Sequence, residues 1–418
     1  MKRFSGLVLV VILLSSTIYA KDNTANNFSI DYLMSVGQYY IDSFYASEQN
    51  TYNENYTISE ERIPVYSENN IIAYIFRVNN KNNDEIGYVM VGSNENSPVI
   101  LEASMEEKLV SYIESEHNNE NVIYIAPLKL AYDISYKGIS KNYRNIRTKE
   151  KIDFKYSEDS DKISRVELNE KNKENWKLVD KVIELDNNLN TFSHNVFLDT
   201  YLSPTVYEVD DEINFVKIQD SSDSSKYYYG GDQSWFSSPY TTSNSCGAVA
   251  AANITAYNAK RYPSAYGDLY NGSGKDTGIF SQNNFISHME KLYDCMDPGL
   301  IGVPSCSEFK SGMSDYFNDC LVCTLNAFDI NTSRYDVFIE GVTEGLSHGA
   351  PIAFIFWDAE NGSVSTDFSF HWITMTKYYK DNNSEIEYFA CSSWGTRYSL
   401  PLYDYWWSYY IEGGVYYW

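Results

Sequence analysis

Cysteine is missing from the first 245 residues of this 418-residue chain, and all six cysteines follow in the second half. A chain held together by a disulfide framework would carry cysteines throughout, so such a framework is excluded as the main source of stability. Pairing of Cys295 with Cys306, or of Cys320 with Cys323, stays open. A zinc site on Cys320 and Cys323 would need two further ligands nearby, and the neighbouring sequence offers none. We therefore expect no metal and no other cofactor.

Basic residues are also scarce. The chain has 32 Lys and Arg against 57 Asp and Glu, which gives a formal net charge of −25. A phosphate backbone or an anionic membrane surface demands a basic protein surface. The composition therefore argues against nucleic acid and against anionic membranes as partners.

Long hydrophobic runs are absent after the start of the chain. Lys2 and Arg3 precede the apolar run Leu7–Leu14, and small and polar residues follow up to Ala20. This pattern predicts an export signal over residues 1–20, cleaved after Ala20. An uncleaved membrane anchor is the alternative, although the apolar run is short for a membrane span. We expect a secreted, extracellular protein with no stable membrane association.

The length and the 43% hydrophobic content are sufficient for two domains with buried cores. The sequence pattern of residues 21–140 predicts a small α+β domain, in which an amphipathic helix over Ser29–Ser47 is followed by three strand-like runs. Residues 141–226 are polar, and only the stretch KENWKLVDKVIEL favours a helix, which is typical of an exposed, protease-accessible connector. Residues 227–418 form the second domain.

The stretch TSNSCGAVAAANITAYNAKRYP contains a single cysteine, Cys246, at the start of an alanine-rich segment. Asn244 and Ser245 suit helix capping, and the pair Tyr262 and Pro263 ends the helix. A thiol at a helix N-terminus is favoured as thiolate, because unsatisfied amides and the helix dipole stabilise negative charge. Cys246 is therefore a candidate nucleophile. The alternative is a small buried core residue.

A thiolate nucleophile needs an imidazole that protonates the leaving amine. His371 opens the strand-like run HWITMTKYY, 125 residues after Cys246, and is the best candidate. Ser392, on the next strand-like run, is the candidate that orients the imidazole, and Gln233 in GGDQSWF is the candidate oxyanion donor. The other four histidines are less suitable: His117, His194, His288 and His348.

Three stretches, in this order, resemble the glutamine-cysteine helix, the Gly-x-Pro strand and the histidine strand of papain-like cysteine peptidases. They are GGDQSWFSSPYTTSNSCGAVAAANITAY, GVTEGLSHGAPIAFIF and HWITMTKYYKDNNSEIEYFACSSWG. The chain is most similar to the bacteriocin-processing-like and streptopain-like groups, over roughly its last 190 residues. The run IIAYIFRVNNKNNDEIGYVMVGSNENSPVILEASM is similar to the propeptide of streptopain-like peptidases, with an unrelated small binding domain as the alternative.

This resemblance implies an α+β protein with a papain-like peptidase fold, preceded by a propeptide-like domain. It implies Cys246 as nucleophile, His371 as general base and acid, and Gln233 as oxyanion donor. The Asn-Ser-Trp-Gly pattern of papain reads Ser-Ser-Trp-Gly here, with Ser392 at the asparagine position and Trp394 in a position to shield the histidine. The gap of 13 residues from Gln233 to Cys246 is also longer than in papain and requires a loop insertion.

The resulting hypothesis is a secreted cysteine peptidase made as a zymogen, which hydrolyses peptide bonds through a thiolate-imidazolium pair. Its partners are a peptide or protein substrate and the propeptide-like domain of the same chain. Two alternatives remain. One is an amidase or acyltransferase on cell-wall or small amide substrates. The other is a catalytically inactive papain-like binding protein, in which the missing asparagine marks lost activity.

Overall fold

The structure is a computed structural model that describes residues 27–46, 56–67, 70–117, 120–133, 143–147, 149, 151–152, 162–189, 203–241, 244–299, 302–303, 305–320, 325–357, 370–402 and 411–418. The expected signal peptide and its cleavage point lie outside these residues. We call the described residues between 27 and 189 the N-terminal unit, and those between 203 and 418 the C-terminal unit.

The N-terminal unit begins with the expected amphipathic helix, which the structure confirms as α1 (Ile30–Ala46). Strands and two further helices follow in chain order: β1 (Thr57–Ser67), β2 (Asn70–Asn79), β3 (Glu85–Gly92), β4 (Ile100–Ser104), α2 (Leu109–Glu116), β5 (Val122–Ala126), β6 (Lys129–Asp133), β7 (Tyr143–Asn145), β8 (Lys151–Ile152) and α3 (Lys162–Leu189).

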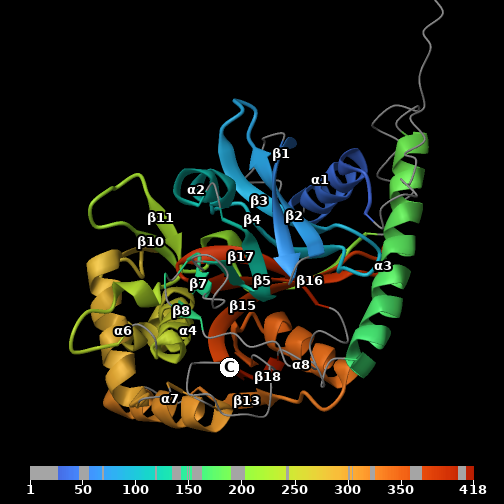
Figure 1. Ribbon diagram of the computed structural model, residues 1–418. Coiled ribbons are helices and arrows are strands. Elements are labelled where there is room, and N and C mark those ends of the chain that lie inside the picture. The colour runs from blue at the N-terminus through green and yellow to red at the C-terminus, as the bar shows by residue number, and fades with distance from the viewer. Residues whose placement is uncertain are drawn as a thin grey trace, which may run out of the picture.

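The C-terminal unit places most of its helices before most of its strands. Its elements are β9 (Thr205–Glu208), β10 (Lys217–Gln219), β11 (Tyr227–Tyr229), α4 (Cys246–Arg261), α5 (Pro263–Tyr266), β12 (Ile279–Ser281), α6 (Gln282–Met296), α7 (Cys306–Cys320), β13 (Ala327–Ile330), α8 (Tyr335–Ser347), β14 (Ile352–Trp357), β15 (Phe370–Lys380), β16 (Glu387–Ser393), β17 (Thr396–Pro401) and β18 (Ile411–Tyr417). In Figure 1 the helices α4 and α7 lie below strands β1 to β4 of the N-terminal unit.

One large sheet runs through both units in the strand order β13-β18-β14-β15-β16-β17-β4-β3-β2-β1-β5-β6-β7-β8, with β9 added beside β15. Its pairings are antiparallel apart from β1 with β5. A separate small sheet has the order β11-β10-β12. The prediction of an α+β protein is confirmed.

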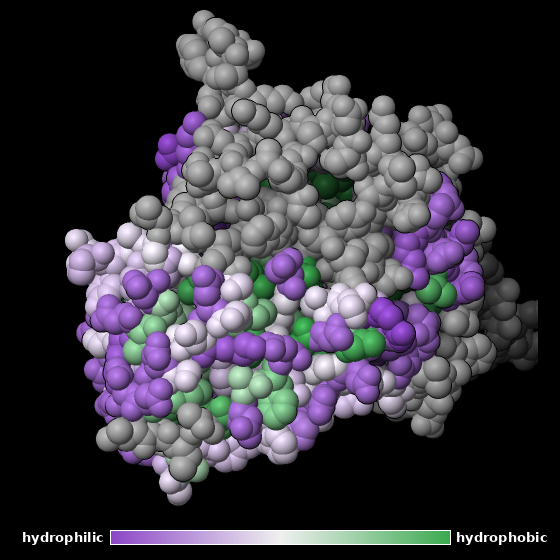
Figure 2. Space-filling view, turned by 90° about the horizontal axis from the view of Figure 1, so that it is seen from below, coloured by the Kyte–Doolittle hydropathy of each residue, from purple (hydrophilic) through white to green (hydrophobic). Residues whose placement is uncertain are grey.

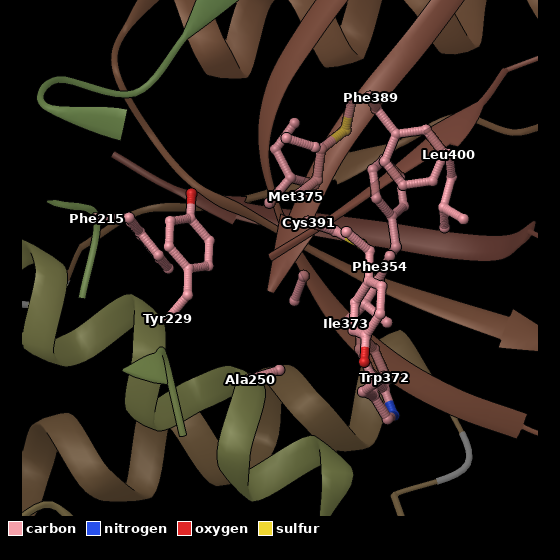
Figure 3. Close-up of a cluster of buried hydrophobic side chains, with 14 of the residues drawn as sticks. Phe215, Tyr229, Ala250, Phe354, Trp372, Ile373, Met375, Phe389, Cys391 and Leu400 are labelled. Atoms are coloured by element: carbon pink, nitrogen blue, oxygen red, sulfur yellow. The ribbon is translucent and has the colours of Figure 1, made fainter. Parts of the chain in front are cut away.

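The hydrophobic core is shared between the two units. One cluster joins side chains of α1, such as Leu33 and Phe44, to side chains of α4 and of strands β14 to β18. Figure 3 shows its centre, where Ala250 on α4 lies below side chains of the sheet, including Ile373 and Met375 of β15. A second cluster belongs to the N-terminal unit alone and packs α2 against the other face of its strands.

Residues 141–226, which the sequence predicts as an exposed connector, include helix α3, strand β9 and several buried side chains. The stretch expected to be helical does lie in α3, where Trp176 is buried and donates a hydrogen bond from Nε1 to the carbonyl oxygen of Ser97 at 2.8 Å. Strand β9 pairs with β15, and the carboxylate of Glu212 is buried and forms an ion pair with Arg397 at 2.9 Å. The polar composition of residues 141–226 did not indicate these buried contacts, because the contacts join segments far apart in the sequence.

Among the residues described, no helix combines the length and the apolar character needed to cross a membrane. The surface seen from below is mostly hydrophilic where it is described, and hydrophobic residues appear there in small separate groups (Figure 2).

Candidate active site

Cys246 is the first residue of α4, as predicted. The turn closes through the main chain, because Val249 N–H donates to the carbonyl oxygen of Ser245 at 3.0 Å, while the Ser245 side chain makes no capping bond. Gly247 follows because of close packing: a Cβ there would lie 2.8 Å from a methyl carbon of Val303 and 3.5 Å from the ring of Trp372. The Cys-Gly pair thus brings the helix N-terminus directly against the start of β15.

The face of α4 that begins with Cys246 continues through Val249, Ala250 and Asn253, at the three-, four- and seven-residue spacing of one helical face. All four residues are buried. The side-chain amide of Asn253 accepts a hydrogen bond from Gly231 N–H at 2.9 Å, through Oδ1. Asn253 is a site residue that was not predicted, although its spacing from Cys246 is a signal that could have found it.

The double glycine before Gln233 allows its loop to pass between α4 and the sheet. Gly230 has a φ of +80°, and a Cβ there would lie 2.2 Å from Ser392 Oγ, so a side chain is excluded on both counts. Gly395 N–H donates to the carbonyl oxygen of Gly231 at 3.0 Å, which ties the loop to the turn between β16 and β17. Gln233 then opens a short 3-10 helix at the edge of the cavity described below.

His371 lies at the start of β15, as predicted, and is partly buried. Its Nε2 is 2.7 Å from the hydroxyl oxygen of Ser393. Its ring stacks on the indole of Trp394, with ring centroids 4.4 Å apart and an interplanar angle of 11°. Trp394 therefore covers the imidazole, in the place that the sequence suggested for a shielding residue.

In this structure Ser393, and not the predicted Ser392, contacts His371. Thr374 of β15 pairs directly with Ser392 of β16. Side chains alternate between the two faces of a sheet, so the positions of His371 and Ser393 share one face, and Thr374 and Ser392 share the other. Ser392 instead donates to the carbonyl oxygen of Tyr229 at 2.6 Å. Ser392 thus anchors the loop that leads to Gln233.

Eleven residues line one small cavity between α4, β15 and β16: Gln233, Cys246, Val249, Ala250, Asn253, His371, Trp372, Thr374, Ser392, Ser393 and Trp394. All four residues predicted for the site are among them. The free volume is about 10 Å³, which is room for about one water molecule. The contacts of the described residues include no hydrogen bond between the sulfur of Cys246 and the imidazole of His371. The cavity as it stands is lined by the catalytic candidates and is too small for a peptide.

Burial keeps both candidate groups neutral at neutral pH. It raises the pKa of the Cys246 thiol to about 11, and the lowering effects of hydrogen bonds from the backbone at Trp372, Gly247 and Cys246 are smaller. Burial lowers the pKa of His371 to about 3, and the nearby positive charge of Lys129 lowers it further. In this state burial favours the neutral thiol and imidazole over the predicted thiolate-imidazolium pair, because the cost of removing charge from water exceeds the help from the helix N-terminus.

Lys129, whose charge acts on His371, belongs to the N-terminal unit. Lys129 opens β6 directly after Leu128, which is buried and has a φ of +62°. Leu128 N–H donates to Glu102 Oε2 at 2.9 Å, and Arg147 donates to the Leu128 carbonyl oxygen at 3.0 Å. These bonds hold the turn between β5 and β6 in an unusual backbone conformation directly before Lys129.

The remaining candidates lie elsewhere. His288 is buried against Thr255, with Nε2 2.8 Å from the hydroxyl oxygen. His348 lies against the ring of Trp418, and His117 belongs to the N-terminal unit. In the described part of the chain no group of three or more His, Cys, Asp and Glu side chains is arranged to hold a metal ion, and Cys323 and His194 lie outside that part.

Comparison with protein-family models found no match for this chain, and comparison with curated proteins found none either. The likeness to papain-like peptidases therefore depends on the quoted motifs and on the arrangement of Cys246, His371 and Gln233 around one cavity.

Proposed function

We propose that this chain is an exported cysteine peptidase with a papain-like catalytic part, made as a zymogen. One observation carries the proposal: Cys246, His371 and Gln233 come from three separate segments and line one cavity. The first is a thiol at a helix N-terminus, the second an imidazole and the third a side-chain amide. These are the nucleophile, the acid-base group and the oxyanion donor that cleavage of an amide bond requires.

In the proposed reaction the Sγ of Cys246 attacks the carbonyl carbon of the substrate. The Cys246 N–H and the side-chain amide of Gln233 donate hydrogen bonds to the carbonyl oxygen and stabilise its negative charge. His371 takes the thiol proton and gives it to the leaving amine as the C–N bond breaks. Water then attacks the thioester, His371 removes its proton, and the acid product leaves with the thiol restored. The hydrogen bond between the Ser393 hydroxyl and Nε2 of His371 favours one tautomer of the imidazole. In this tautomer Nδ1 is the nitrogen that transfers the proton.

The described state fits the latent form of such an enzyme. The cavity has room for about one water molecule, both groups are neutral, and a cation of the N-terminal unit lies near the imidazole. Reaction requires that the cavity open and that His371 turn toward the sulfur. The zymogen part of the proposal is that this change follows a cut between the units, in the region that links them.

The test compares the chain before and after limited proteolysis, using wild type, Cys246→Ala and Ser305→Ala. Ser305 is a serine that does not line the cavity and serves as the control. We expect proteolysis to raise the hydrolysis of an unstructured peptide in wild type and in Ser305→Ala, and Cys246→Ala to stay inactive. Equal activity of Cys246→Ala and wild type would contradict the proposal. Cleavage of small amides but of no peptide would favour an amidase, and a thiol that never reacts with iodoacetamide would favour a binding protein.

A further inference from the structure

We propose that the N-terminal unit remains bound to the C-terminal unit as a non-covalent subunit after the chain is cut between residues 190 and 202. The partner on this surface of the C-terminal unit is thus the chain's own N-terminal part. The inference rests on the proposed function in one respect, because the proposed activation of the zymogen requires a cut in this region. It predicts that activation rearranges contacts at the site without loss of the N-terminal unit.

Backbone groups join the two units at the centre of the large sheet. Strand β4 lies beside β17, with Ala103 paired to Ser399. The hydroxyl of Ser104 donates to the carbonyl oxygen of Arg397 at 2.8 Å, and the N–H of Arg397 donates to the carboxylate of Glu106 at 2.9 Å. Separation would leave both edges of the sheet without these partners, and an unpaired sheet edge is unfavourable in a folded protein.

Helix α1 packs its aromatic side chains against the C-terminal unit. The ring of Tyr40 lies 4.5 Å from that of Tyr388, and the ring of Phe44 lies 5.4 Å from that of Tyr379. Leu33, Phe44 and Ile41 are fully buried, and Val36 and Tyr40 are nearly so. Release of the unit would expose the rings of Tyr40 and Phe44 together with those of Tyr379 and Tyr388, and aromatic side chains of this kind are typical of covered interface cores.

Polar contacts at the same interface are buried and specific. The hydroxyl of Tyr39 donates to the carboxylate of Asp381, whose residue is only 3% exposed. The hydroxyl groups of Tyr40 and Ser399 are hydrogen bonded to one another. A buried carboxylate that loses its donor is costly. These pairs therefore oppose separation.

Arg397 adds a cationic contact. Its guanidinium lies over the rings of Phe44 and Tyr45, at 5.9 and 5.4 Å from their centroids. On the other side of the interface Arg147 lies over the ring of Tyr398 at 5.0 Å, and Tyr398 meets Trp394 edge-on at 6.4 Å. The N-terminal unit thus packs behind the indole that covers the candidate histidine. Its retention would preserve that support.

The N-terminal unit also has a core of its own, which makes it a defined partner. Its second hydrophobic cluster includes Ile75, Met90, Val110 and Ile113, and none of its members comes from the C-terminal unit. Helix α3 packs on the same unit, since Trp176 lies 4.5 Å from Phe28 between ring centroids. Both pieces are therefore expected to keep their folds while they are held together.

The test uses the full chain in a Cys246→Ala background, with a recognition sequence for a specific protease inserted between residues 190 and 202. The folded protein is cut and passed through a gel-filtration column at about 1 μM, where only a tight complex survives. We expect both pieces in one peak. Phe44→Ala, which removes an aromatic contact across the interface, should give two peaks. The matched control Ile113→Ala, a deletion in the separate N-terminal core, should still give one.

Two peaks from the cut parent protein, or precipitation of one piece, would overturn the inference. Circular dichroism before the cut shows whether Phe44→Ala folds. If it does not, Tyr39→Phe replaces it, and the urea concentration that separates the cut pieces should fall relative to the parent. An unchanged urea concentration would also count against the interface. Because Cys246→Ala has no candidate nucleophile, these outcomes are independent of whether the chain is a peptidase.

Discussion

The imidazole of His371 and the indole of Trp394 lie nearly parallel, with centroids 4.4 Å apart. Trp394 holds this position in a left-handed backbone conformation, with φ of +47°, and the next residue, Gly395, has φ of +69°. Ser393 and Thr396 pair on either side, so the two residues form the tight turn between β16 and β17. Such turns favour Asn-Gly, and a bulky first residue is strained by about 1–3 kcal/mol.

We predict that Trp394→Asn lowers peptide hydrolysis strongly and the free energy of unfolding only weakly. Relief of the strained turn offsets part of the loss of a partly buried indole, so the free energy of unfolding should fall by less than truncation of a buried Trp usually costs. Truncation of a buried Trp otherwise costs about 3–5 kcal/mol. Peptide hydrolysis by the cut protein should fall at least about tenfold, because the imidazole loses its cover. Urea denaturation and kcat/KM measure the two effects. A large loss of stability, or unchanged kcat/KM, would contradict this explanation of the strained residue.

We predict that Ser393→Ala lowers kcat of the cut protein by about tenfold or more, a part of what general acid-base catalysis supplies. The hydroxyl of Ser393 is the group that meets Nε2 of His371, at 2.7 Å. The pH dependence of kcat should shift in the same variant, which loss of packing alone would not cause.

Ser392→Ala is the matched comparison, because Ser392 is the adjacent serine and bonds Tyr229 on the opposite face. It should lower stability by about 1 kcal/mol through the loss of that buried hydrogen bond, with the pH profile of kcat unchanged. If the two variants exchange these behaviours, Ser392 rather than Ser393 orients the histidine in the active form.

The sequence contained the local parts of this arrangement and lacked the long-range ones. Helix α4 and its first residue Cys246 followed from alanine content and from the Tyr-Pro pair at its end. The choice between Ser392 and Ser393 depends on the register of β15 against β16, and a shift of one residue exchanges the faces. No local pattern fixes that register.

Burial was the second quantity that the sequence could not supply. A thiol at a helix N-terminus suggests a lowered pKa, yet the packing around Cys246 raises it. The same holds for the segment 141–226, whose polar composition gave no sign that Glu212 would be buried with Arg397. Such contacts depend on residues that are distant in sequence.

We predict that the chain loses stability as the pH falls from about 6.5 toward 3, and that His288 contributes. Burial lowers the pKa of His288 to about 3, with a smaller effect from Lys291. Between these pH values the unfolded chain binds the proton and the folded chain does not, so stability falls with pH and the contribution is complete above the unfolded pKa. From pH 6.5 to 4.5 the loss is on the order of 2 kcal/mol.

Urea denaturation of wild type and His288→Gln at several pH values tests this contribution. The variant loses a contact to Thr255, so its stability at pH 7 should be lower. Its slope of unfolding free energy against pH should be shallower, because glutamine does not titrate. Parallel slopes for the two proteins would mean that His288 is not the group that titrates.

The last prediction concerns the reactivity of Cys246 in the uncut chain. With a pKa of about 11, this thiol should react with iodoacetamide slowly at pH 7, and its rate should still rise above pH 9. Lys129→Gln should raise the pKa of His371, but burial is the larger cause of its low value, so the imidazole should stay neutral at pH 7 and the alkylation rate should change little. Lys129→Arg keeps the charge and should leave the rate unchanged.

Mass spectrometry of the peptide that contains Cys246 separates its alkylation from that of Cys295, Cys306 and Cys320, which are partly exposed. If Lys129→Gln reacts faster at pH 7 than Lys129→Arg, the charge of Lys129 helps to keep the thiol neutral, and burial alone does not account for it. If the wild-type rate is already half-maximal below pH 7, Cys246 is a thiolate in the uncut chain. In that case the N-terminal unit does not hold the site in a latent state, because a thiolate next to His371 needs no further activation to attack a carbonyl carbon.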